Sequence, residues 1–203
     1  VWGETIATET LQGVSYRMYP QRPRRVESIL DFAPGWGERP HIIQGGQCIG
    51  FAQFHAAVQT QCRRLAQDGL RAGDRVFLLG WNSPEWIIHF WACLRLGAVP
   101  VLANAWWTAS EIQQGLTLLR PKLVLADASA AGKITGWPMG HWAVDVSAPA
   151  GDPLPLGSAD EEETAIIIFT SGTSGQAKAV VLKHRALLAR LQVDRPVAVE
   201  IAL

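Results

Sequence analysis

The chain has 203 residues, of which 48% are apolar and 18% are charged, and its 18 basic side chains balance its 18 acidic ones. This composition indicates a globular domain with a sizeable core, and a net charge of zero gives no electrostatic basis for a nucleic-acid partner. Three sparse cysteines, Cys48, Cys62 and Cys93, favour reduced thiols and a cytoplasmic protein. No signal-peptide pattern opens the chain. The even spacing of Cys48, His55 and Cys62 is unlike the tighter pairs of a zinc site, so no metal site is predicted.

The first 50 residues are predicted to form an irregular segment that ends in a hairpin. Residues 26–32 have the pattern of a short helix, and the basic run of Arg22, Arg24 and Arg25 is interpreted as a solvated loop. Gly45-Gly46 separates two short apolar runs, and paired glycines favour a tight hairpin turn.

An α/β domain is predicted over residues 51–203. Apolar residues recur at helical spacing over residues 51–65, and residues 76–79 form a short apolar strand. Ser83-Pro84 is typical of a helix start and Gly97 of a helix end. A strand at residues 99–103 follows.

The apolar stretch at residues 86–107 invites comparison with a membrane span. It contains His89, Arg95, Gly97 and Pro100, however, and a spanning helix needs about 20 predominantly apolar residues. A buried helix, a glycine stop and a buried strand explain the stretch better, so no transmembrane segment is predicted.

The second half of the chain continues the alternation of strands and helices. Thr108 and Glu111 form a capping box for a third helix. Further strands are predicted at residues 123–126, 143–146, 165–169 and 180–182, a last helix at 184–191, a Pro/Gly-rich linker at 149–157 and a solvated acidic run at Glu161, Glu162 and Glu163. This order predicts an α/β fold with a mostly parallel sheet covered by helices on both faces.

The most informative segment is the run Phe169-Thr-Ser-Gly-Thr-Ser-Gly-Gln-Ala-Lys178, between two predicted strands. Glycines let a backbone turn its N–H groups toward a ligand, hydroxyls add donors, and a lysine adds positive charge, so the segment suits a polyphosphate. It is not a Walker A loop, a nucleophile elbow or a dinucleotide fingerprint. A Ser/Gly-rich hairpin loop without a ligand is the alternative.

The segment resembles the phosphate-binding signature of the adenylate-forming enzymes, which include acyl-CoA synthetases. The pattern is matched at Thr170, Ser171, Gly172, Thr173, Gly175, Lys178 and Val180. Ser174 replaces threonine, Ala177 replaces proline and Ala179 replaces glycine, and the last two changes put the loop geometry in question. Weaker matches at residues 51–54, 73–86 and 93–101 extend the resemblance to about residues 29–191.

The resemblance implies the first lobe of the large N-terminal domain of an adenylate-forming enzyme. It implies an ATP-dependent ligase that converts a carboxylic acid to an acyl-adenylate and then to a thioester of CoA, with Mg²⁺ bound to the phosphates. The ATP phosphates are expected to be held by Thr170, Ser171, Gly172, Thr173, Ser174, Gly175 and Lys178. The family's catalytic residues are expected beyond Leu203. The chain begins with Val1 and is less than half as long as the family's members, so we expect a fragment that is inactive and poorly soluble by itself.

Two other interpretations stay open. The chain could be a phosphate-binding remnant without catalysis, which Ala177, Ala179 and the unfamiliar sequence after residue 191 favour. It could also belong to an adenylation domain that loads a carrier-protein thiol in place of CoA. Trp106-Trp107 follows a predicted strand, where ligands bind in open α/β sheets, although core packing is the more frequent role of tryptophan.

Overall fold

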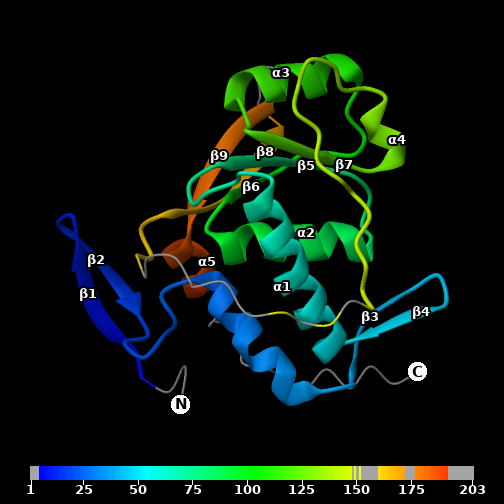
Figure 1. Cartoon of the computed structure of the whole chain (residues 1–203). Helices are drawn as coiled ribbons and strands as arrows, with labels where there is room; N and C mark the ends of the chain where they lie inside the picture. Colours follow the sequence, from blue (N-terminus) through cyan, green and yellow to red (C-terminus); the bar gives the residue numbers. More distant parts are fainter. Residues whose placement is uncertain (1–4, 148, 150, 152–159, 172–176, 192–203) are drawn as a thin grey trace.

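A computed structural model describes residues 5–147, 149, 151, 160–171 and 177–191 of the chain. Its centre is a five-stranded sheet with the strand order β7-β5-β6-β8-β9 (Figure 1). The strands are β5 (Arg75–Leu79), β6 (Val99–Leu102), β7 (Leu123–Ala126), β8 (Thr164–Ser171) and β9 (Ala177–Lys183). The first four in the order are parallel, and β9 pairs antiparallel with β8. The predicted mostly parallel sheet is therefore confirmed.

Helices cover both faces of this sheet, as predicted (Figure 1). The helices α1 (Phe51–Gln67) and α2 (Pro84–Leu96) pack on one face, and α3 (Ala109–Leu119) and the short α4 (Ala128–Ala131) pack on the other. The inner strand β5 contributes to the cores on both faces of the sheet, because alternate residues of a strand point to opposite faces. Its Val76 and Leu78 join the core under α1 and α2, whereas Phe77 and Leu79 join the core under α3.

The helices α2 and α3 are capped by the residues that the sequence predicts. The Ser83 hydroxyl accepts a hydrogen bond from the backbone N–H of Trp86 at the start of α2, and Gly97 ends that helix with φ at 78°. Thr108 and Glu111 satisfy each other's backbone N–H groups at the start of α3. Helix α5 (His184–Leu191) follows β9 and packs through Leu188 near Leu94 of α2.

The first 50 residues are more regular than the sequence indicates. A hairpin of β1 (Ala7–Leu11) and β2 (Val14–Met18) was not predicted, and it is followed by the 3-10 helix η1 (Val26–Trp36), which includes the predicted helical residues. The predicted hairpin is confirmed as β3 (Pro40–Gln44) and β4 (Gln47–Gly50), with both turn glycines at positive φ. The two hairpins lie at opposite sides of the molecule (Figure 1).

The predicted strand at residues 143–146 is wrong. Trp142, Val144 and Val146 do alternate inward and pack against the core of α1 and α2, which explains the apparent strand pattern. Residues 143–146, all of which the structure describes, form no β-ladder, however, and an isolated bridge joins Val124 of β7 to Met139 just before them.

Both charge runs that were interpreted as solvated are partly buried. Arg22 and Arg25 are each less than 10% exposed, and so is Glu161. Arg22 and Glu161 form a bidentate ion pair across 139 residues of sequence. The prediction failed because local composition cannot reveal a partner that is far away in the chain.

No described helix is both long enough and apolar enough to cross a membrane. The apolar stretch at residues 86–107 is most of α2, the stop at Gly97 and strand β6, as the sequence predicts.

Candidate functional site

The strands β8 and β9 carry the predicted phosphate segment between them. Residues 172–176, which include the predicted Gly172, Thr173, Ser174 and Gly175, lie outside the described residues. Ser171 ends β8 and Lys178 is the second residue of β9. The structure therefore describes how the flanks of the segment are held.

Thr170 and Lys178 are cross-strand neighbours. The Thr170 hydroxyl lies 3.5 Å from the Lys178 carbonyl oxygen, and both side chains are exposed. Directly opposed residues of an antiparallel pair present their side chains on the same face. Two of the predicted phosphate ligands, a hydroxyl and an ammonium, are thus brought side by side.

The two sequence departures at the end of the segment cause no backbone strain. Ala177 pairs with Ser171 and Ala179 pairs with Phe169 within the β8–β9 ladder. Neither alanine is among the residues with positive φ. The concern that Ala179 stands where glycine is needed for its φ is therefore removed.

The carboxyl end of β8 lies at the edge of the sheet where ligands bind in open α/β folds. Strands β5, β6, β7 and β8 are parallel, so their carboxyl ends all lie at this edge. Ser171 ends β8 there.

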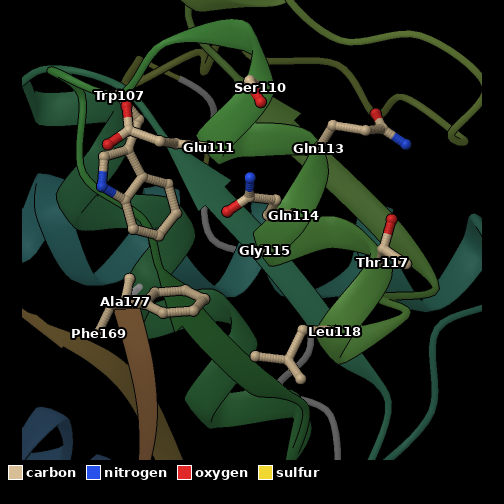
Figure 2. Close-up of a pocket in the computed structure, with 10 residues that line it drawn as sticks. All are labelled: Trp107, Ser110, Glu111, Gln113, Gln114, Gly115, Thr117, Leu118, Phe169 and Ala177. Carbon is tan, nitrogen blue, oxygen red and sulfur yellow. The ribbon is translucent and has the colours of Figure 1, made fainter. Parts of the chain in front are cut away.

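A cavity of about 510 Å³ adjoins both flanks of the segment (Figure 2). It is lined by Trp107, Ser110, Glu111, Gln113, Gln114, Gly115, Thr117, Leu118, Phe169 and Ala177. Figure 2 shows the rings of Trp107 and Phe169 together on one side and Gln114 and Leu118 of α3 on the other. Cavities of this size, with aromatic walls and a few polar groups, are typical small-molecule sites.

The aromatic wall of this cavity is fixed by packing. The Trp107 and Phe169 rings meet edge to face with centroids 4.7 Å apart, and Phe77 of β5 supports Phe169 from the core at 6.4 Å. A Cβ atom at Gly115 would lie 3.1 Å from the Trp107 ring, so glycine lets α3 approach it closely. The wall is therefore a rigid part of the core.

The polar residues of the cavity come from α3 and were not predicted. Ser110, Gln114 and Leu118 are four residues apart and share a helix face. Glu111 is held by the Thr108 backbone N–H and hydroxyl, and these hydrogen bonds lower the pKa of its carboxyl group. The sequence reveals this face but not that it meets β8.

A second hollow of about 380 Å³ lies at the carboxyl ends of β5 and β6. Its rim includes Trp81 and Trp106, whose rings meet edge to face at 4.8 Å. Trp106 is 78% exposed whereas Trp107 is 8% exposed. The two neighbouring tryptophans therefore differ in role: Trp107 packs in the core and Trp106 projects from it.

The remaining candidates do not form a site. Among the residues that the structure describes, no group of three or more His, Cys, Asp or Glu is arranged to hold a metal ion. Cys48 is exposed on β4 whereas Cys62 is buried in α1. His184 is buried, and its Nδ1 accepts a hydrogen bond from the Val26 backbone N–H, so it packs at the start of α5.

The comparisons with known proteins agree on one family. A sequence model of the family described as "AMP-binding enzyme" matches residues 30–200. The chain is 29% identical over 189 residues to the medium/long-chain-fatty-acid–CoA ligase FadD6 of Mycobacterium tuberculosis, which covers 85% of this chain and 32% of that protein. It is 35% identical over 145 residues to the 2-succinylbenzoate–CoA ligase of Geobacillus kaustophilus, which covers 71% of this chain and 30% of that protein.

Solved structures with a similar fold include a CoA synthetase. The O-succinylbenzoate coenzyme A synthetase (MenE) of Bacillus subtilis, solved in complex with AMP, superposes with a TM-score of 0.63 and 26% identity. That match covers 76% of this chain and 41% of the other. The chain spans about a third of the length of the curated CoA ligases that it matches.

Proposed function

Because the family model matches most of its length, the chain belongs to the AMP-binding enzyme family, and we propose that its parent protein is an ATP-dependent acid–thiol ligase. In this reaction a substrate carboxylate attacks the α-phosphorus of ATP and pyrophosphate leaves. A thiol then takes the acyl group from the acyl-adenylate and AMP is released. The observation that carries the proposal is the juxtaposition of Thr170 and Lys178 at the end of the matched segment.

The residues of the segment have binding and neutralising roles in this proposal. The hydroxyls of Thr170, Ser171, Thr173 and Ser174 and the N–H groups beside Gly172 and Gly175 hold the β- and γ-phosphates. Lys178 would add positive charge to them, and Mg²⁺ that enters with ATP would neutralise further phosphate charge. Fixed donors of this kind stabilise the charge that develops in phosphoryl-type transfers.

The acceptor and the acid are proposed by class. The names of the relatives favour CoA as the thiol and either a fatty or an aromatic acid as the substrate. The apolar Trp107–Phe169 wall gives the cavity beside the segment the character of a site for an apolar or planar group. A cytoplasmic location is proposed with this function.

The chain by itself is proposed to lack activity, because the family's remaining catalytic parts are expected beyond residue 203. We also propose the division of the chain into residues 1–50 and 51–203. Acyl-adenylate formation is measured as acid-dependent exchange of pyrophosphate into ATP. This exchange should be undetectable with the 203-residue chain. Turnover by this chain would show that the proposed inactivity is wrong.

The Lys178→Ala substitution tests the phosphate site. Loss of a charged contact to phosphate costs about 1.5–3 kcal/mol, so calorimetry should show the dissociation constant of ATP–Mg²⁺ rising about tenfold or more. Lys183→Ala is the matched control, because Lys183 is an exposed lysine at the other end of β9 that pairs with Glu162. The control should bind within about twofold of the unmodified chain.

Two results would count against this assignment. Equal affinities of the unmodified chain and Lys178→Ala would remove Lys178 from the site. Equal losses in Lys178→Ala and Lys183→Ala would indicate a general effect of charge in place of a phosphate contact.

A further inference from the structure

Four charged side chains form a closed ring, which we call the ionic ring: Glu9, Arg22, Glu161 and Arg185. The Arg22 guanidinium donates to both oxygens of Glu9 at 2.6 and 2.7 Å and to both oxygens of Glu161 at 2.6 and 2.9 Å. Arg185 closes the ring by pairing with Glu9 at 3.1 Å and with Glu161. Bidentate pairs of this type are the strongest and most directional ion pairs in proteins.

The ring is partly enclosed by the protein. The Arg22 side chain is fully buried and that of Glu161 is 5% exposed, whereas that of Glu9 is 29% exposed. The hydrogen bond from Arg22, with help from Arg185, lowers the pKa of Glu9 to about 2. Glu9 therefore stays charged throughout the physiological range, and removal of Arg22 takes a bidentate partner from the buried Glu161.

The ring joins three separate parts of the chain. Glu9 lies in β1 and Arg22 follows β2, so both belong to the N-terminal hairpin region. Glu161 precedes β8 and Arg185 follows β9, and the Arg185 backbone N–H also donates to the Glu161 carbonyl at 2.9 Å. The N-terminal hairpin is thus attached to the base of the β8–β9 hairpin, at the end opposite the phosphate segment.

The base of the β8–β9 hairpin is the end at which an attachment can act on its register. The ladder pairs Thr164 with Lys183 there, close in sequence to Glu161 and Arg185 of the ring. Within the described sheet β9 has only β8 as a neighbour. A shift of one residue would turn every side chain of β9 to the opposite face.

We propose that the ionic ring fixes the register of β8 and β9 and so makes Arg22 a positioning residue for the phosphate segment. Held in the observed register, Lys178 stands opposite Thr170. The expected effect on ATP binding rests on the proposed function, whereas the expected effect on the register of the β8–β9 ladder does not. The N-terminal hairpin therefore affects ligand binding through the register of β9, without contacting the ligand.

The experiment compares Arg22→Gln, Glu9→Gln and Arg95→Gln in the full chain. Glu9→Gln is the milder change, because Glu9 is the more exposed acid of the ring, and it keeps the test valid if Arg22→Gln does not fold. Arg95→Gln is the matched control: Arg95 is also a buried arginine in an ion pair, with Asp31 at 2.7 Å, but it lies in α2 and outside the ring. Backbone hydrogen exchange of β9 and the dissociation constant of ATP–Mg²⁺ are measured for each.

In the ring variants the backbone amides of Val180 and Leu182 should exchange about tenfold faster than in the unmodified chain. Arg95→Gln should leave these exchange rates unchanged, even where it lowers the free energy of unfolding by the same amount. ATP–Mg²⁺ should bind about five- to tenfold more weakly to the ring variants alone, and Arg22→Lys should recover part of that loss. Unchanged exchange in β9 of the ring variants, or an equal change in Arg95→Gln, would overturn the proposal. Faster exchange confined to the ring variants in a chain that binds no ATP would support the ring and reject the ATP site.

Discussion

Replacing Phe77 by alanine is expected to lower the free energy of unfolding by about 3–5 kcal/mol. Phe77 is fully buried in β5, and its ring belongs to the core that joins the sheet to α3. The space left by the ring cannot close easily, because Ile112 and Leu116 are themselves held by the helix. Domains are stable by only about 5–15 kcal/mol, so the variant should be close to unfolding at room temperature.

Urea unfolding followed by circular dichroism measures this effect, and Phe32→Ala is the matched control. Phe32 is the same residue type but is 61% exposed, so its loss should cost less than about 1 kcal/mol. The two variants should unfold with similar dependence on urea concentration. A small loss in Phe77→Ala would mean that α3 does not pack on β5 as described.

The same substitution connects the core to the candidate site. Phe77 supports the ring of Phe169, and Phe169 forms the cavity wall with Trp107. If Phe77→Ala remains folded, the part of its tryptophan fluorescence that a Trp107→Phe substitution removes should report a looser wall even at low urea. The rigidity of the candidate site therefore depends on a residue that contacts no ligand.

The elements that the sequence predicts correctly are those that local signals determine. Helix α2 begins at Ser83-Pro84 and ends at Gly97, and each signal acts through backbone groups of its own neighbours. The strands of the sheet are continuous apolar runs, which is the pattern of a parallel sheet that is buried on both faces. The match of the phosphate segment to its family is likewise local, because it depends on consecutive residues.

What the sequence could not predict depends on contacts between distant residues. The ion pair of Arg22 and Glu161 spans 139 residues, so each charge run looked solvated when considered separately. At residues 143–146 the sequence predicts a strand that does not form. Alternating inward side chains need a packed surface beneath them but no neighbouring strand. The cavity beside β8 needs both Phe169 and the Gln114 face of α3, and nothing in either segment indicates the other.

Lowering the pH from 7 to 5 is expected to destabilise the protein by about 2 kcal/mol through His89 alone. His89 is fully buried, and burial lowers its pKa to about 4 although a hydrogen bond with the Trp142 carbonyl at 2.8 Å opposes the shift. Its Nδ1 has no partner among the described residues, so a second proton there would lack an acceptor. The unfolded chain takes up that proton near pH 6.5 and the folded chain does not, so stability present above pH 6.5 is lost toward pH 4.

His89→Gln isolates this contribution, because glutamine keeps an N–H donor but does not titrate in this range. Between pH 7 and pH 5 the variant should lose about 2 kcal/mol less stability than the unmodified chain in urea unfolding, whereas His141→Gln, at an exposed histidine, should behave like the unmodified chain. His184 is a poorer probe although its pKa is also lowered to about 4 by burial, since the buried Glu27 beside it has a raised pKa and titrates in the opposite sense. Identical pH profiles for His89→Gln and the unmodified chain would mean that His89 accepts its proton within the fold, which the buried and unpaired Nδ1 does not permit.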